Sequence, residues 1–225
     1  MPEEHARVAG APDRPIRVLI VDDHEVLASS LAMVLDAEPD ITTAGVATTL
    51  EQARALVATA RPDVLLLDHR MPDGDGVAAI PALRSLRPSI GVVVLTASAA
   101  DHVLMSAIEN GASGFLSKTR SLDEVTNAVR AAAAGESVIS PELLARLLPR
   151  FGRGKVHSAD ELTDREREVL ALVAEGLPNA AIAERLVVSV HTVRNHIASL
   201  SAKLGAHSKL EALSIAVRQG LLPDL

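Results

Sequence analysis

The sequence contains no cysteine, tryptophan or tyrosine, and its aromatic residues are Phe115 and Phe151. Without cysteine the chain forms no disulfide and holds no metal through thiolates, which agrees with a cytoplasmic protein. Without an aromatic platform, stacking of nucleic-acid bases on side chains is disfavoured as a binding mode.

Long hydrophobic runs are also missing. Apolar runs such as residues 64–67 and 92–95 have the length of a strand, whereas a membrane span needs about 20 apolar residues. Residues 1–15 are polar and lack the apolar core of a secretory signal. We therefore expect a cytoplasmic protein with no membrane partner, which begins with a disordered tail over residues 1–15.

The net charge of −7 argues against nucleic-acid binding only if it is evenly spread. Residues 15–136 carry 9 Lys and Arg against 16 Asp and Glu, which gives −7 for that part alone. Residues 189–210 contain Arg194, Lys203 and Lys209 and no acidic residue. A local basic surface matters more for DNA binding than the total charge.

The first 136 residues alternate between strand and helix patterns. Continuous apolar strands alternating with helices predict a parallel sheet that is covered on both faces. We expect a five-stranded α/β domain over residues 16–136, and a linker over residues 137–160 that contains a helix from 141 to about 148 and a flexible stretch from 149. The expected strands are at 16–21, 41–47, 64–67, 90–95 and 114–116, and the expected helices are at about 25–37, 49–60, 76–86, 100–110 and 121–134.

Residues 161–225 show helical patterns and no strand. Thr163 and Glu166 have the spacing of a capping box, in which each side chain bonds the other's backbone N–H. Short helices are predicted at about 179–186, 190–204 and from 208 to about 220, because cap residues and glycines bound them. The pattern indicates a separate all-α domain.

Charged residues follow the apolar strands of the α/β domain. Ligands bind beyond the carboxyl ends of parallel strands, and Asp22 and Asp23, Asp68, Thr96 and Lys118 stand at four such ends. Three carboxylates that meet there repel one another unless a divalent cation such as Mg²⁺ lies among them. Asp68 then becomes a nucleophile for a phosphoryl group, whose oxygens the metal, Lys118 and Thr96 stabilise.

The acidic loop of residues 73–76 follows this aspartate. It resembles part of a calcium loop, but it lacks the ligand spacing and the closing Glu of an EF-hand. We interpret it as a turn followed by the N-cap of the next helix.

Residues 16–134 resemble the receiver domain of two-component response regulators, through the segments VLIVDDHEVL, DVLLLDHRMPDGDG, VVVLTAS and GASGFLSK. The resemblance implies a flavodoxin-like fold with strand order 2-1-3-4-5. It implies that Asp68 is the phosphoacceptor, that Thr96 and Phe115 are switch residues and that Lys118 is the family's site lysine, although Thr119 replaces the usual proline. The implied Mg²⁺ ligands are Asp23, Asp68, the Arg70 backbone carbonyl and, through water, Asp22.

Residues 162–222 resemble the LuxR-type helix-turn-helix of the NarL/FixJ subfamily, with the motif proper over residues 179–198. Helix 179–186 would cross the DNA backbone, and helix 190–204 would read the major groove. Ala180 and Ala198 stand where relatives often carry Lys, which implies weaker DNA binding. The implied DNA-binding residues are Asn179, Thr192, Val193, Arg194, Asn195, Ala198 and Lys203.

Together these features predict a DNA-binding response regulator and not an enzyme, apart from its own phosphoryl transfer and dephosphorylation. Expected partners are promoter DNA, a sensor histidine kinase, a second copy of the chain and RNA polymerase. A Mg²⁺-dependent phosphohydrolase of the haloacid-dehalogenase type would need an acid two residues after the nucleophile, where this sequence has Arg70. A constitutive DNA binder with a dimerising receiver, and an inert helical bundle, are the competing hypotheses.

Overall fold

The computed structural model describes residues 14–97, 100–151 and 162–222. Of the predicted tail, only residues 14 and 15 lie within this part, and residues 152–160 of the predicted connector lie outside it. Among the described residues, no helix combines the length and the apolar character that crossing a membrane requires.

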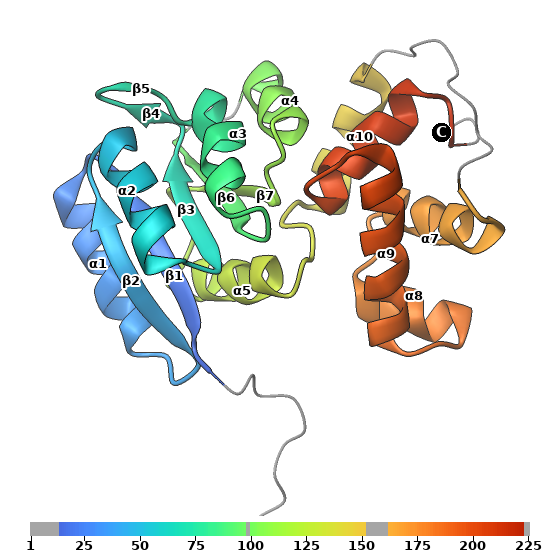
Figure 1. The fold of residues 1–225 in the computed structure, drawn as a ribbon, viewed down its shortest axis with the longest axis horizontal. Coiled ribbons are helices and arrows are strands. Elements are labelled where there is room, and N and C mark those ends of the chain that lie inside the picture. The colour runs from blue at the N-terminus through green and yellow to red at the C-terminus, as the bar shows by residue number, and fades with distance from the viewer. Residues whose placement is uncertain (1–13, 98–99, 152–161, 223–225) are drawn as a thin grey trace, which may run out of the picture.

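The N-terminal domain is built on a five-stranded parallel sheet with the order β2-β1-β3-β6-β7, which confirms the predicted order (Figure 1). Strand residues alternate between the two faces, so that Leu19 and Val21 face one hydrophobic layer while Val18 and Ile20 face the other. The predicted boundaries hold to within one or two residues. The strands are β1 (Ile16–Val21), β2 (Ile41–Ala47), β3 (Val64–Asp68), β6 (Gly91–Thr96) and β7 (Gly114–Ser117).

Helices cover both faces of this sheet. One face packs against α1 (Glu25–Asp36) and α5 (Leu122–Ala133), and their buried residues form a single cluster with β1 and β3. The other face packs against α2 (Leu50–Ala60), α3 (Gly76–Leu86) and α4 (Asp101–Glu109). This three-layer arrangement leaves the carboxyl ends of the strands open to a ligand.

The acidic loop after β3 caps two helices. Asp73 accepts hydrogen bonds from the backbone N–H groups of Leu50 and Glu51 at the start of α2, and Asp75 is the N-cap of α3. Gly76 begins α3 where a Cβ would overlap the carbonyl oxygen of Asp68. The predicted turn and N-cap are thus confirmed, but a two-residue hairpin, β4 (Arg70–Met71) with β5 (Gly74–Asp75), was not predicted.

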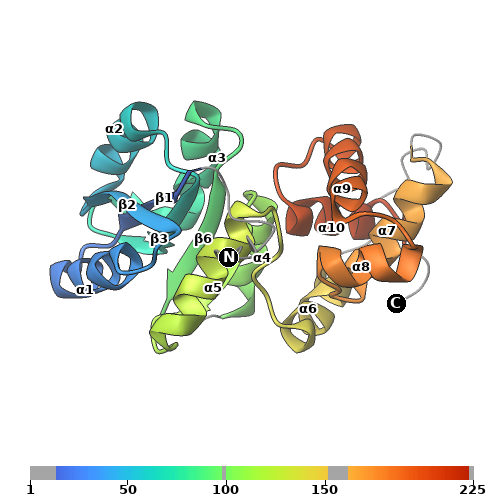
Figure 2. The same cartoon turned by 90° about the horizontal axis from the view of Figure 1, so that it is seen from below.

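The C-terminal domain is all-helical, as predicted. Its described elements are α7 (Asp164–Ala174), α8 (Asn179–Leu186), α9 (Val190–Leu204) and α10 (Lys209–Arg218) (Figure 2). The Thr163–Glu166 capping box is present at the start of α7. Between the domains lie α6 (Pro141–Leu147), close to the predicted 141–148, and a 3-10 turn over Leu148–Arg150.

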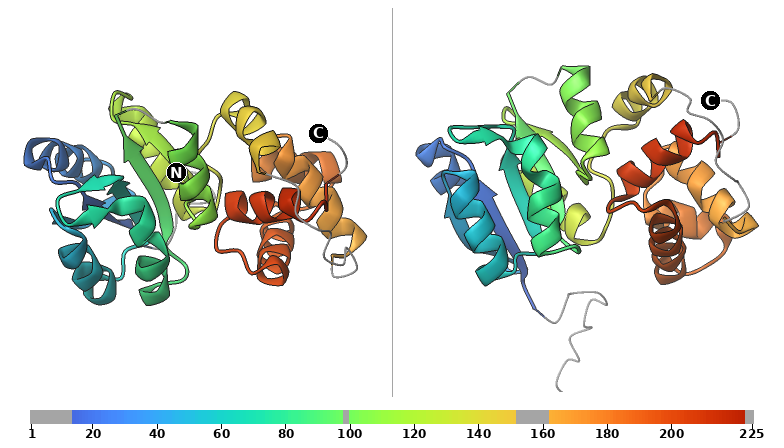
Figure 3. Two further views of the ribbon diagram at one scale, coloured as in Figure 1. Left: turned by 90° about the horizontal axis from the view of Figure 1, so that it is seen from above. Right: turned by 45° about the horizontal axis from the view of Figure 1, so that its top comes forward.

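The two domains contact each other through α10, α4 and the segment between the domains. Ser208, the N-cap of α10, donates a buried hydrogen bond of 2.9 Å to the carbonyl of Ala112, which follows α4. Leu147 and Phe151 join the hydrophobic cluster that runs from the sheet into the helical domain. The red segment that contains α10 accordingly lies on the side of the helical domain that faces the N-terminal domain (Figure 3).

Candidate functional site

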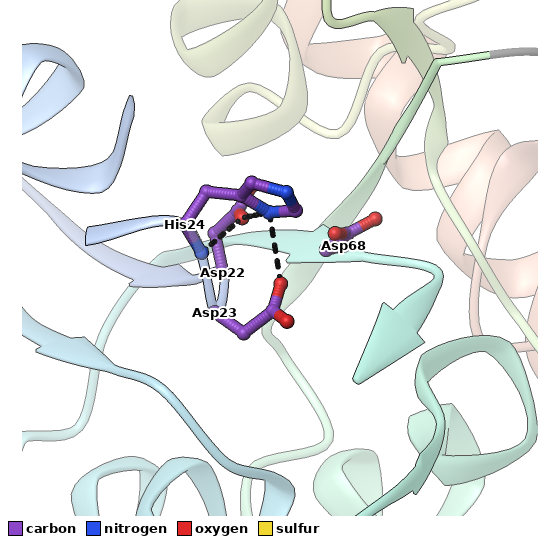
Figure 4. A group of neighbouring side chains, drawn as sticks. All are labelled: Asp22, Asp23, His24 and Asp68. Atoms are coloured by element: carbon purple, nitrogen blue, oxygen red, sulfur yellow. Dashed lines mark hydrogen bonds and ion pairs between the residues drawn. The ribbon is translucent and has the colours of Figure 1, made fainter. Parts of the chain in front are cut away.

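Three carboxylates gather at the carboxyl ends of β1 and β3 (Figure 4). Asp22 is fully buried and Asp68 is 4% exposed, whereas Asp23 lies at the surface. One ligand atom from each of these residues and from His24 lies within 4.8 Å of the others. The predicted convergence of acidic residues is therefore present in the geometry.

Lys118, directly after β7, joins this group from the opposite side. Its Nζ lies 2.6 Å from Asp22 Oδ2 and 2.6 Å from Asp68 Oδ2. Burial would lower the pKa of Lys118, but hydrogen bonds and charges from the two aspartates outweigh burial and raise this pKa above its usual value. Lys118 therefore stays charged at neutral pH and neutralises part of the acidic site.

Thr96 lies on β6, which pairs with the strand of Asp68, and Phe115 lies on β7, the next strand of the sheet. Thr96 ends β6 and is 3% exposed, and its carbonyl accepts a hydrogen bond from the Lys118 backbone N–H. Phe115 is 9% exposed and points into the protein. Both residues line a cavity of about 520 Å³ between β7, α5 and the segment that leads into α6.

Two histidines at this site were not predicted as site residues. His24 Nδ1 lies 3.0 Å from Asp22 Oδ1 and 2.9 Å from Asp23 Oδ1, and His69 Nδ1 lies 3.6 Å from Asp68 Oδ1. Each histidine directly follows an acidic residue in the sequence. The sequence segments DDH (residues 22–24) and LDH (residues 67–69) therefore contain the information that places both histidines at the site.

The donor set fits a hard divalent cation. Lys118 supplies one positive charge against three carboxylates, so the site keeps an excess of negative charge, and oxygen ligands suit Mg²⁺. A second cavity of about 520 Å³ opens onto Asp23, Asp68 and Lys118. The backbone N–H of Arg70 bonds Asp68 Oδ1 at 3.3 Å, which holds the Arg70 backbone beside the same carboxylate.

The predicted DNA-binding residues lie on α8 and α9 but in different surroundings. Arg194 and Asn195 are exposed on α9, as is Ala198. Val193 is fully buried in the hydrophobic core, so its side chain supports α9, and we correct its place in the DNA-binding set. Val193 lies three residues after Val190 and four before Ile197, a spacing that puts all three on one face of α9.

Three further members of the predicted set are engaged within the protein. Thr192 donates its backbone N–H to the N-cap Ser189. Lys203 Nζ lies 2.7 Å from Glu166. Asn179 is 1% exposed and lies at the contact with the N-terminal domain.

The outward face of α9 is turned toward the N-terminal domain. Arg194 and Ala198 line one cavity together with Arg84 and Pro88 of that domain. Arg194 also lines a second cavity with Asp63 and other residues at the amino ends of the strands. In this arrangement the N-terminal domain stands where DNA would approach the predicted reading helix.

Each of the two domains matches a known protein family. Residues 18–130 match the family described as "Response regulator receiver domain". Residues 160–216 match the family described as "Bacterial regulatory proteins, luxR family".

Similar whole proteins contain both parts in the same order. The chain is 37% identical to the DNA-binding transcriptional activator DevR/DosR of Mycobacterium tuberculosis, over 89% of this chain and 94% of the relative. It is 32% identical to the response regulator protein VraR of Staphylococcus aureus, over 92% of this chain and 99% of that protein.

Solved structures give the same result for the fold. The response regulator RcsB of Salmonella typhimurium superposes with a TM-score of 0.53 at 26% identity, over 89% of this chain and 97% of RcsB. The receiver domain of a putative response regulator NarL from Mycobacterium tuberculosis superposes with a TM-score of 0.53 at 31% identity, over 55% of this chain and 99% of that domain.

Proposed function

The chain belongs to the two-component response regulators that join a receiver domain to a LuxR-type helix-turn-helix DNA-binding domain, and we propose that phosphorylation of Asp68 controls its binding to promoter DNA. A sensor histidine kinase donates the phosphoryl group. The observation that carries this proposal is the position of Asp68, at the end of a buried strand and 2.6 Å from Lys118, beside two further carboxylates.

Each residue has a distinct role in the phosphoryl transfer. An oxygen of Asp68 attacks the phosphorus, and the bond from phosphorus to the donor's imidazole nitrogen breaks. Asp23, Asp68 and the Arg70 carbonyl would hold Mg²⁺ directly and Asp22 would hold it through water, and the bound ion would supply positive charge to the phosphoryl oxygens. Lys118 neutralises a further oxygen, and the Thr96 hydroxyl donates a hydrogen bond to the phosphorylated side chain.

The regulatory step follows from where Thr96 and Phe115 lie. A Thr96 hydroxyl that moves toward the phosphoryl group vacates space at the cavity that it shares with Phe115. The altered surface of the receiver domain releases the outward face of α9. In the cytoplasm the released chain then forms a homodimer on two half-sites of DNA. RNA polymerase is then the protein that the bound dimer influences. The description of DevR/DosR as a transcriptional activator supports this kind of output.

A phosphohydrolase is the second candidate that a phosphorylatable aspartate suggests. Enzymes of the haloacid-dehalogenase type use an acid two residues after the nucleophile, and Arg70 occupies that position. Its guanidinium Nε–H donates a hydrogen bond to His69 Nε2, and a guanidinium group keeps its protons in proteins and so cannot act as a general acid. The family assignment is one of transcriptional regulators, so the response-regulator function is favoured.

Phosphorylation is tested by intact-mass measurement. The wild-type chain, incubated with Mg²⁺ and a small acyl phosphate, should gain one phosphoryl group, whereas Asp68→Asn should gain none. Asp75→Asn is a matched control, because Asp75 caps α3 and lies outside the site. Undiminished labelling of Asp68→Asn would refute Asp68 as the phosphoacceptor.

A further inference from the structure

Glu136 of the receiver domain binds the amino end of α8 in the DNA-binding domain. Both of its carboxylate oxygens accept the backbone N–H of Asn179, at 3.0 and 3.2 Å. The Nζ of Lys209 lies 3.3 Å from the same carboxylate. Glu136 thus acts as an anion that is seated between a helix N-terminus and a buried lysine.

The DNA-binding domain builds the receiving side of this contact by itself. Lys209 Nζ donates to the carbonyl of Leu177 at 3.1 Å and to Asn179 Oδ1 at 3.0 Å. The Lys209 side chain is only 5% exposed, so these two bonds hold its ammonium beside the first turn of α8. The receiver domain supplies only the negative charge that completes the site.

An anion stabilises a buried ammonium that lies beside a helix N-terminus. Burial lowers the pKa of Lys209, and Glu136 counteracts part of that effect. When the domains separate, the Asn179 N–H and the ammonium lose the carboxylate together. Helix N-termini bind phosphate well, and α8 is the helix that crosses the DNA backbone in a helix-turn-helix.

We propose that the Asn179 amide and Lys209 form a binding site for a DNA backbone phosphate, and that Glu136 occupies this site when the receiver domain is docked. Docking of the receiver domain and binding of this phosphate then exclude each other. The proposal rests on the proposed function, because it specifies how the DNA-binding domain is held back before phosphorylation. It adds Lys209, which the sequence places in a local basic surface but not among the implied DNA contacts, to the DNA-binding residues.

Hydrogen bonds connect the segment that follows Glu136 to β7, the strand that leads to Lys118 of the phosphorylation site. Two residues after Glu136, Val138 donates its N–H to the Ser113 carbonyl and accepts the Phe115 N–H at 2.8 Å. Phe115 lies on β7, which leads directly to Lys118. A shift of β7 on phosphorylation therefore acts on the segment that holds the Glu136 carboxylate.

Another interdomain ion pair provides a matched control. Arg218 of α10 lies 3.3 Å from Glu109 of α4, and both side chains are 41% exposed. This pair also links the two domains, but Glu109 is not seated at a helix N-terminus. Loosening the interface in general would affect both pairs, whereas phosphate competition involves Glu136 alone.

The first test compares Glu136→Gln with Glu109→Gln in the full, unphosphorylated chain. The probe is a DNA duplex that the phosphorylated wild type selects from a random library. Glu136→Gln should raise the affinity at least about fivefold, the low end of common coupling factors between sites. Glu109→Gln should change it by less than about twofold. Equal affinities of Glu136→Gln and wild type, or an equal gain in Glu109→Gln, would overturn the competition.

The second test adds Lys209→Gln to the Glu136→Gln chain, so that no interdomain pair remains to be broken at this site. If Lys209 meets a phosphate, affinity should fall for matched and scrambled DNA alike, and the slope of log affinity against log salt should become smaller by about one. Lys209→Arg should restore both. An unchanged salt slope in a folded double variant, together with no higher affinity in the Lys209→Arg chain than in the Lys209→Gln chain, would refute the phosphate site.

A third measurement does not depend on the folding of the Lys209 variants. In the ¹⁵N spectrum of the Glu136→Gln chain, the Asn179 amide should shift when the duplex is added, and an unmoved Asn179 amide in the bound state would refute the site. Failure of the proposed function looks different, because then the phosphorylated wild type itself would bind no duplex.

Discussion

Asp68 in the receiver domain and Glu166 in the DNA-binding domain are both buried carboxylates with a lysine close by. Lys118 lies 2.6 Å from Asp68, and Lys203 lies 2.7 Å from Glu166. Both carboxylates are 5% exposed or less at the side chain. Judged by these pairs alone, the two sites look equivalent.

The remaining partners of Glu166 make it structural. Its carboxylate also accepts hydrogen bonds from the Thr163 backbone N–H, from the Thr163 hydroxyl and from Ser199. Burial alone would raise the pKa of Glu166, but these bonds and Lys203 outweigh it and lower this pKa to about 2. Both oxygens are satisfied, and no further acid competes for Lys203 within the described residues.

Asp68 differs because Lys118 is shared. Asp22 takes the same ammonium at 2.6 Å, and Asp23 adds a third carboxylate nearby. A cavity opens onto the group. The comparison teaches that a carboxylate prepared for chemistry is recognised by neighbouring carboxylates that share its lysine and by access from a cavity, and not by burial or by a neighbouring lysine alone.

The largest effect is expected for Glu166→Gln. A pKa that falls from its usual 4.5 to about 2 corresponds to roughly 3 kcal/mol of folding stability. The variant should lose about that much, measured by hydrogen exchange of α7 and α9 amides with mass spectrometry. Glu168→Gln, whose side chain is 54% exposed, should change the stability by less than about 0.5 kcal/mol. Equal losses in the two variants would remove the structural role of Glu166.

Acid should abolish the difference in folding stability between wild type and Glu166→Gln. Because the folded pKa of Glu166 is lowered, its contribution is fully present above the unfolded pKa of about 4.5 and is lost as the pH falls toward about 2. The gap between the two unfolding free energies should be constant from pH 7 to about 5 and should close below that range. Denaturant titrations at a series of pH values measure it, and a gap that persists at pH 2 would contradict the stated cause.

The receiver site should respond to Asp23→Ala through the metal and not through the fold. Removing one charged oxygen ligand should weaken Mg²⁺ binding at least about tenfold, which is roughly 1.4 kcal/mol. Calorimetry measures the affinity, and circular dichroism checks the fold. Asp36→Ala on α1 is the control, because Asp36 lies outside the carboxylate group. An unchanged Mg²⁺ affinity in Asp23→Ala would show that Asp23 is not a ligand of the metal.

The smallest effect should have the opposite sign to that of Glu166→Gln. In the absence of divalent cations, Asp68→Asn removes a repulsion while Lys118 keeps Asp22 as a partner. We expect stability to rise by about 1 kcal/mol in urea denaturation with a chelator present. A loss of similar size would mean that Asp68 is as fully satisfied as Glu166, and the contrast between the two sites would fail.

Much of the fold was predictable because four of the five strands are largely apolar and end at or beside a chemically distinct residue. Asp22, Asp68, Thr96 and Lys118 are strand-terminal in the sequence, and parallel topology alone brings them to one edge. The helices of the DNA-binding domain were predictable from caps such as Thr163 and from helical spacing. The two-residue hairpin β4–β5 was missed because so short a pairing has no periodicity to detect.

Contacts between distant segments could not be predicted. Glu136 and Lys209 are 73 residues apart, and both appear in the sequence as ordinary charged residues near helix ends. His24 and His69 adjoin the acidic residues in the sequence, yet only the folded sheet shows that their rings turn toward the carboxylates. Val193 shares the helical periodicity of Val190 and Ile197, which accounts for its buried side chain although it belongs to the implied DNA-binding set.

The most direct test of the account measures DNA affinity before and after phosphorylation. Wild type and Asp68→Asn are each treated with Mg²⁺ and the acyl phosphate, phosphorylation is verified by intact mass, and binding to the selected duplex is titrated by fluorescence anisotropy of labelled DNA. The account predicts that treated wild type binds at least about tenfold more tightly than untreated wild type, while Asp68→Asn is unchanged by the treatment. An equal gain in Asp68→Asn, or full phosphorylation of wild type without any gain in affinity, would contradict it.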